Sequence, residues 1–121
     1  MDTITKKKAQ RFLYLRRIYE ITEGKQLVWV NRIELGRELG WDDETTNDVV
    51  NYLREERLIE TRTFTKANIT HLGVKVIERA LEQPDNSTEY FPAASIIIVV
   101  NGDFTVGGDV VGRDKTTASG Q

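Results

Sequence analysis

The stretch "RLIETRTFTKANITHLGVKVIE", from Arg57 to Glu78, decides the fold that the sequence predicts. Two segments rich in β-branched residues, "LIETRTF" and "NIT", flank a short "TKA", and this pattern predicts a tight hairpin. Thr70 then stands where a helix N-cap is expected, and apolar residues follow it at helical spacing, namely Leu72, Val76, Ile77, Ala80 and Leu81. The stretch is therefore predicted to be a hairpin followed by a helix.

Two short helices joined by a turn are predicted upstream of the hairpin. Asn31 followed by Glu34 is a capping-box pattern that begins a helix, and Gly40 suits the left-handed residue that ends it. Asp42 or Asp43 begins the next helix, whose expected inward face carries Val49, Val50, Tyr52 and Leu53. Because only a few residues around a glycine separate the two helices, the spacing is that of a helix-turn-helix.

A longer helix is predicted over residues 5–24, before these elements. Its apolar side recurs at steps of three and four residues, and Gly24 is a plausible stop; the inward residues are Phe12, Leu15, Ile18, Tyr19 and Thr22. Its other positions carry six cations, which are Lys6, Lys7, Lys8, Arg11, Arg16 and Arg17. The predicted order is thus helix, helix-turn-helix, hairpin and helix.

Residues 5–83 resemble winged helix-turn-helix domains. In that family a leucine-isoleucine step opens the wing, as at Leu58-Ile59, and a threonine-x-x-glycine sequence begins the closing helix, as at Thr70 to Gly73. The resemblance implies an α+β fold, with the second helix of the helix-turn-helix in the major groove of double-stranded DNA and the wing on the backbone.

The C-terminal stretch "SIIIVVNGDFTVGGDVVGRDK", from Ser95 to Lys115, is predicted to be a β segment that assembles chains. Asn101-Gly102 favours a type I′ hairpin, whereas glycines and valines spaced by six residues favour a short β-solenoid. A lone two-stranded ribbon is marginal in water and leaves a sticky edge. We expect homo-oligomerisation through Ile96, Ile97, Ile98, Val99, Val100, Phe104, Val106, Val110 and Val111. Two alternatives stay open: the run packs back on its own domain as an added strand, or a different partner's sheet captures it.

Four segments follow from these patterns. They are a winged-helix domain over 1–83, a linker over 84–94, the β assembly segment over 95–115 and a disordered tail over 116–121. The stretch from Ser87 to Lys115 also resembles glycine-aspartate tails that follow small helical modules in bacterial conflict and signalling proteins. That second resemblance implies a defence or signalling protein as a partner.

The distribution of charged residues is compatible with either DNA or a protein as the partner. Residues 1–83 carry 15 Lys and Arg against 14 Asp and Glu, so any basic surface must be local. The expected nucleic-acid contacts are the six cations of the first helix, Thr45, Asn47, Asn51 and Arg54 of the third, and Arg62 and Lys66 of the wing. Against this, Asp42, Asp43, Glu44 and Asp48 would repel phosphates.

The sequence predicts a non-enzymatic protein with no cofactor and no metal. It has no cysteine, its one histidine (His71) stands at a helix start, and its neighbouring acids point about 100° apart on a helix. Its longest apolar run has five residues and no signal core precedes the first helix, so we expect a cytoplasmic protein without a membrane span. Four aromatic residues are interpreted as packing groups: Trp29, Trp41, Tyr52 and Phe64.

Overall fold

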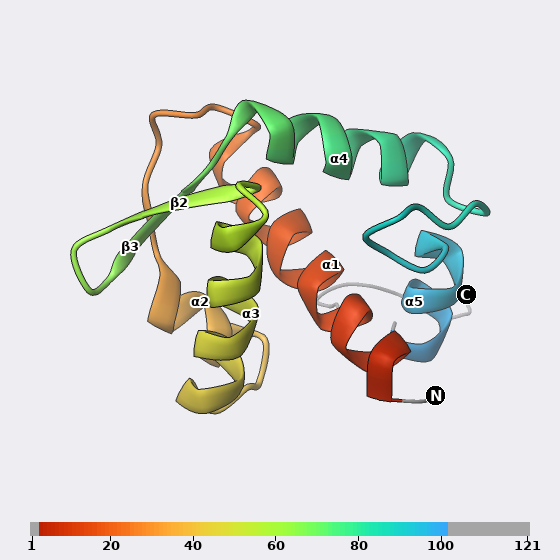
Figure 1. The fold of residues 1–121 in the computed structure, drawn as a ribbon, viewed down its shortest axis with the longest axis horizontal. Coiled ribbons are helices and arrows are strands. Elements are labelled where there is room, and N and C mark those ends of the chain that lie inside the picture. The colour runs from red at the N-terminus through yellow and green to blue at the C-terminus, as the bar shows by residue number, and fades with distance from the viewer. Residues whose placement is uncertain (1–2, 102–121) are drawn as a thin grey trace, which may run out of the picture.

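A computed structural model describes residues 3–101 of the chain (Figure 1). Within that range the protein has five helices and a three-stranded antiparallel sheet, so the α+β class is confirmed. The elements are α1 (Thr3–Thr22), β1 (Val30–Asn31), α2 (Arg32–Glu38), α3 (Asp43–Glu55), β2 (Ile59–Arg62), β3 (Lys66–Ile69), α4 (His71–Glu82) and α5 (Ala94–Asn101).

Helix α1 is the centre of the packing. It contacts α3, α4 and β3, and it crosses the middle of the molecule in Figure 1. The predicted inward residues Phe12, Leu15 and Ile18 are fully buried. Residues that the pattern does not include are buried as well, namely Ala9, Leu13 and Tyr14. The Tyr14 hydroxyl donates to the Arg32 carbonyl at 2.9 Å, and burial raises the pKa of this phenol far above its usual range. α1 is thus covered on several sides.

Both helices of the helix-turn-helix pair begin at the caps that the sequence predicts. The side chain of Asn31 accepts hydrogen bonds from the backbone of Ile33 and Glu34, both at 3.0 Å, and so begins α2. Asp42 accepts from the backbone of Thr45 at 2.8 Å and begins α3, while Gly40 adopts φ +86° in the turn. α2 and α3 contact each other closely between these caps.

The sheet has the strand order β1-β3-β2, with Ile59 opposite Ile69 and Arg62 opposite Lys66. The hairpin is present, but its turn lies at residues 63–65, so the turn predicted at "TKA" is wrong. Lys66 and Ala67 belong to β3 because they pair with both neighbouring strands, and Ala67 is fully buried between them. Thr63 adopts φ 55° at the displaced turn.

The chain after α4 packs back onto the domain, which corrects the predicted linker over 84–94. Phe91 is only 1% exposed, and its ring meets the Phe12 ring edge-on at 5.5 Å between centroids. The Thr88 hydroxyl accepts from the backbone of Phe91 at 3.0 Å, and the Ser95 backbone donates to the Pro84 carbonyl at 2.8 Å. These residues complete the core instead of separating two parts.

The strand predicted at the start of the β assembly segment is also wrong, because Ala94–Asn101 forms helix α5. Ile97 is fully buried in the core of its own chain, whereas Ile96 is 54% exposed. A helix satisfies its backbone hydrogen bonds internally, so Ile97 is buried here without a sheet edge to pair with. Within the expected assembly surface, residues 102–115 lie outside the described residues, and so do the side chains of Ile98, Val99 and Val100.

Candidate nucleic-acid interface

The outward face of α3 carries three of the residues predicted to meet a nucleic acid. Thr46, Val49, Val50 and Leu53 are buried, so the helix turns its opposite side to solvent. Asn47, Asn51 and Arg54 are exposed on that side, while Thr45 is half-buried toward α1. Acidic residues share the same outward face, and they are Glu44, Asp48 and Glu55.

The negative charge of α3 is only partly neutralised within the chain. The bond from the Thr45 backbone holds the pKa of Asp42 below its usual range, so this carboxylate is charged at neutral pH. Asp43 pairs with Arg37 at 3.1 Å. Among residues 3–101, Glu44, Asp48 and Glu55 have no such ion pair, so the middle of the outward face is acidic.

A basic groove lies beside the C-terminal end of α3. This hairpin groove has a volume of about 520 Å³ and is lined by Trp29, Arg54, Arg57, Arg62 and the neighbouring Ile59, Glu60, Thr61 and Thr70. The Arg62 guanidinium lies 4.8 Å from the centre of the Trp29 ring. In the described part of the chain none of the three arginines is held in an ion pair, so their positive charge is available to a ligand.

The tip of the hairpin next to this groove is also basic. Arg62 and Lys66 face each other across β2 and β3, and like charges placed directly opposite destabilise a sheet. Phe64 is 87% exposed in the turn, so its predicted role in packing is wrong. Only the backbone of Phe64 is held: its carbonyl oxygen accepts a hydrogen bond from Arg32 Nε at 2.8 Å.

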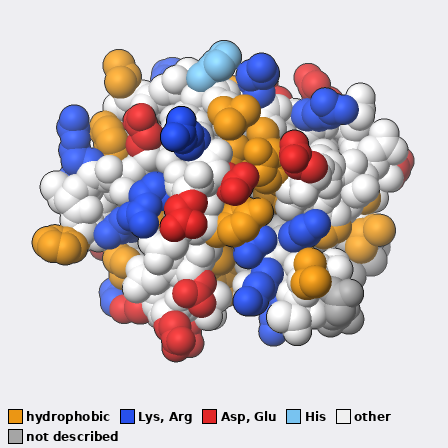
Figure 2. Space-filling model, viewed as in Figure 1, with side chains coloured by type: hydrophobic (Ala, Val, Ile, Leu, Met, Phe, Trp, Pro, Cys, Tyr) orange, Lys and Arg blue, Asp and Glu red, His pale blue; other side chains and the backbone are white. Residues whose placement is uncertain are grey.

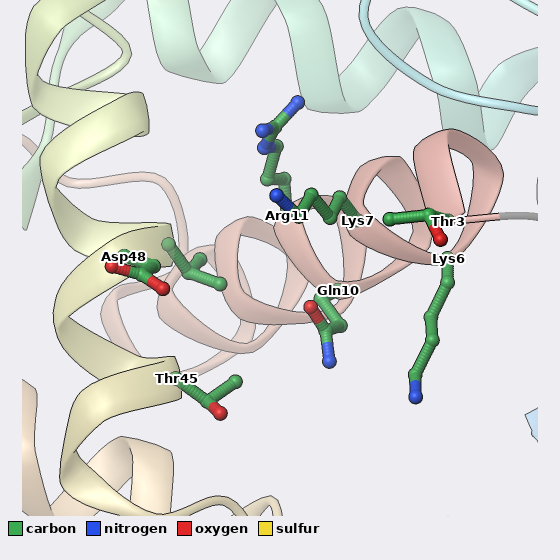
Figure 3. Close-up of a pocket in the computed structure, with 8 residues that line it drawn as sticks. Thr3, Lys6, Lys7, Gln10, Arg11, Thr45 and Asp48 are labelled. Carbon is green, nitrogen blue, oxygen red and sulfur yellow. The ribbon is translucent and has the colours of Figure 1, made fainter.

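A second groove separates the first turns of α1 from α3 (Figure 3). This α1–α3 groove has a volume of about 460 Å³; Lys6, Lys7 and Arg11 line its α1 side, and Thr45 and Asp48 line its α3 side. In Figure 3, Thr45 projects from α3 toward the groove, while Lys6 extends away from its own helix. The Arg11 guanidinium lies 3.4 Å from the centre of the Tyr52 ring.

The remaining cations of α1 are not part of either groove. Arg17 pairs with Glu38 at 2.8 Å and with Glu20 at 3.4 Å, and Arg16 lies 3.7 Å from Glu20. Lys8 is half-buried and lines neither groove. The structure therefore divides the six cations predicted to act together, and only Lys6, Lys7 and Arg11 lie in a groove.

Both grooves flank the acidic face of α3 on one side of the molecule. Figure 2 shows Lys and Arg side chains toward the hairpin and toward the first turns of α1, with Asp and Glu side chains over α3 between them. The sequence does not single out Trp29 or Arg57 as site residues. Arg57 follows the end of α3 with φ 63°, a left-handed conformation that carries no sequence signal in a residue other than glycine or asparagine.

No protein-family model matches the chain, and neither a curated protein nor a solved structure matches it. None of the helices described over residues 3–101 combines the length and apolar character that crossing a membrane requires. In the same range, no group of three or more histidine, aspartate or glutamate side chains is placed to hold a metal ion.

Proposed function

We propose that this protein is a non-enzymatic winged helix-turn-helix protein that binds double-stranded DNA weakly, with the hairpin groove as its main contact. The observation that carries the proposal is the gathering of Arg54, Arg57 and Arg62, free of ion pairs among the described residues, around one groove beside α3. Arginine donates in a fork that matches phosphate oxygens, and neutralising phosphates supplies most of the affinity for duplex DNA.

The acidic face of α3 explains why the proposed binding is weak. Glu44 and Asp48 lie on the side of α3 that a major groove would receive, and their carboxylates repel phosphates. Asn47 and Asn51 are exposed on the same side and could accept and donate to adenine edges. We therefore assign positioning on the backbone to the hairpin groove and leave α3 a small share of the affinity.

Arg57→Ala and Arg62→Ala are each expected to weaken binding to random-sequence duplex DNA. Each substitution removes a cation of the hairpin groove, so each lowers the slope of log affinity against log salt by about 0.9. Fluorescence anisotropy titrations at low and at moderate salt measure both quantities. Arg17→Ala is the matched control, because this arginine is already paired with Glu38 and should leave the slope unchanged.

Neutralising acids on α3 is expected to strengthen binding to duplex DNA. Glu44→Gln combined with Asp48→Asn should raise the affinity for the same duplex, because two exposed carboxylates no longer face the phosphates. The proposal is wrong if the unaltered protein does not bind duplex at low salt, or if loss of Arg57 and Arg62 leaves the binding curve as it was.

A second candidate function is favoured by the acidic face itself. Glu44, Asp48 and Glu55 are exposed and without ion pairs among residues 3–101, which suits a protein partner with a basic surface. The protein would then be an adaptor in a bacterial defence or signalling system. Neutralising Glu44 and Asp48 separates the two functions, because it should strengthen contact with DNA but weaken capture of a basic protein.

A further inference from the structure

The α1–α3 groove has two walls of opposite charge. Lys6, Lys7 and Arg11 make its α1 wall positive. Asp48 makes its α3 wall negative, and Glu44 lies one helical turn before Asp48 on the outward face of the same helix. The groove is therefore bipolar, and its ligand must be positive where it meets α3 and negative where it meets α1.

The charges of this groove are not used up within the chain. Among the described residues, Lys6, Lys7 and Asp48 have no ion pair, and Lys6, Lys7 and Asp48 are all exposed. Arg11 is directed to the Tyr52 ring and not to a carboxylate. Ile4 stands on the same first turns of α1 and is 68% exposed, which adds apolar area beside the charged wall. The groove thus offers both signs of charge and a contact area to a partner.

We infer that this groove binds a second copy of the chain in a two-fold symmetric dimer. A two-fold axis through the groove places the α1 wall of each copy on the α3 wall of the other, so every facing pair has opposite charge. DNA or an acidic peptide would match the α1 wall but would be repelled by Asp48 and Glu44. A second copy satisfies both walls at once, which is why charge complementarity selects it.

The dimer differs from the association expected through the C-terminal segment, since it uses only residues of α1 and α3. It leaves both hairpin grooves uncovered, because their arginines line a separate groove at the other end of α3. If the proposed DNA binding holds, two weak sites on one particle add avidity. The Glu44→Gln and Asp48→Asn test of that binding is therefore made at protein concentrations where the chain is a monomer. The dimer itself does not depend on that function, and it is tested without DNA.

Charge-swapped variants of the full chain test the dimer by sedimentation velocity over a wide range of protein concentrations. Lys6→Glu with Lys7→Glu makes both walls negative, and Glu44→Lys with Asp48→Lys makes both walls positive. Each variant alone should raise the dimer Kd at least about tenfold, because like charges then face each other. An equimolar mixture of the two variants should restore the dimer, because every facing pair is again opposite. Moderate salt should weaken all of these dimers.

Controls keep the result specific to this groove. All four substituted side chains are exposed, so circular dichroism spectra and melting curves should match those of the unaltered protein. Lys75→Glu, an exposed change on α4, should leave the dimer Kd as it is. Lys6→Gln with Lys7→Gln should raise the dimer Kd less than the charge-reversed variant does, because it removes positive charge without adding negative charge. A monomer at every concentration, a dimer that ignores both variants, or a mixture that fails to associate would each overturn the inference.

Discussion

Replacing Gly73 with alanine is expected to lower the free energy of unfolding by about 3 kcal/mol, because the new Cβ has no room. It would lie 2.1 Å from the Leu58 carbonyl oxygen, 2.9 Å from Ile69 Cγ1 and 3.1 Å from the Leu58 carbonyl carbon. The carbonyl is backbone and accepts from the Thr70 amide at 3.1 Å, so it cannot rotate away. Relief requires α4 to move away from the end of α3.

Helix propensity predicts the opposite sign for this substitution. Alanine is about 1 kcal/mol better than glycine inside a helix, so Gly73→Ala would stabilise α4 if nothing touched it. Urea denaturation followed by circular dichroism decides between the two effects. Lys75→Ala on the same helix is the control, since its exposed side chain should change stability by no more than about 0.5 kcal/mol. A Gly73→Ala protein as stable as the original would show that α4 does not pack on Leu58 as described.

Phe91→Ala is expected to lower the free energy of unfolding by about 3–5 kcal/mol, the usual range for a buried phenylalanine. Phe91 is 1% exposed and meets Phe12 edge-on, so its loss leaves a cavity against the middle of α1. Truncation after Asn86 should be at least as damaging, because it also removes Ala94 and Ile97 from the core. Thermal and urea melts of both variants measure the effect.

Ile96→Ala is the matched control for the C-terminal segment. Ile96 lies next to Ile97 on α5 but is 54% exposed, so its truncation should change stability by about 1 kcal/mol or less. If Phe91→Ala and Ile96→Ala were equally mild, the segment from Pro84 to Ile97 would not be part of the core. A truncated chain that melts as the whole chain does would lead to the same conclusion.

The parts of the fold that the sequence predicts well are those decided within a few residues. Asn31, Asp42 and Thr70 each cap a helix by accepting from a backbone amide two or three positions ahead, so their role is visible in local spacing. The left-handed φ of Gly40 is also predicted locally, because glycine is favoured at the residue that ends a helix. These four residues place the helix-turn-helix and the start of α4 without any knowledge of tertiary contacts.

The C-terminal segment could not be predicted in this way, because its conformation depends on contacts made far along the chain. Five β-branched residues in a row favour a strand locally, but Ala94–Asn101 forms a helix that buries Ile97 in the core of the chain. The sequence of α1 does indicate that a further segment covers this helix. Leu13 and Tyr14 lie off the predicted apolar side, and a helix that is apolar on several sides needs cover on several sides.

In the candidate site, too, some features can be predicted from local spacing and others only from the fold. The pair of Arg16 and Glu20 has the i, i+4 spacing of a helical ion pair and could have been removed from the predicted site by inspection. The pair of Arg17 and Glu38 joins α1 to α2 and needs the fold. The hairpin groove needs it too, because Trp29 precedes β1 while Arg57 follows α3, and only the sheet brings them together.

The edge contact between Phe12 and Phe91 has a consequence for the order of events at the ribosome. A nascent chain that has emerged only as far as Glu82 already contains α1 to α4 and the whole sheet, yet one side of its central helix is still bare. Such an intermediate exposes an aromatic surface of the kind that chaperones and aggregating neighbours bind. Synthesis of this domain is therefore expected to pass through a vulnerable interval that closes only when Phe91 and Ile97 have left the exit tunnel.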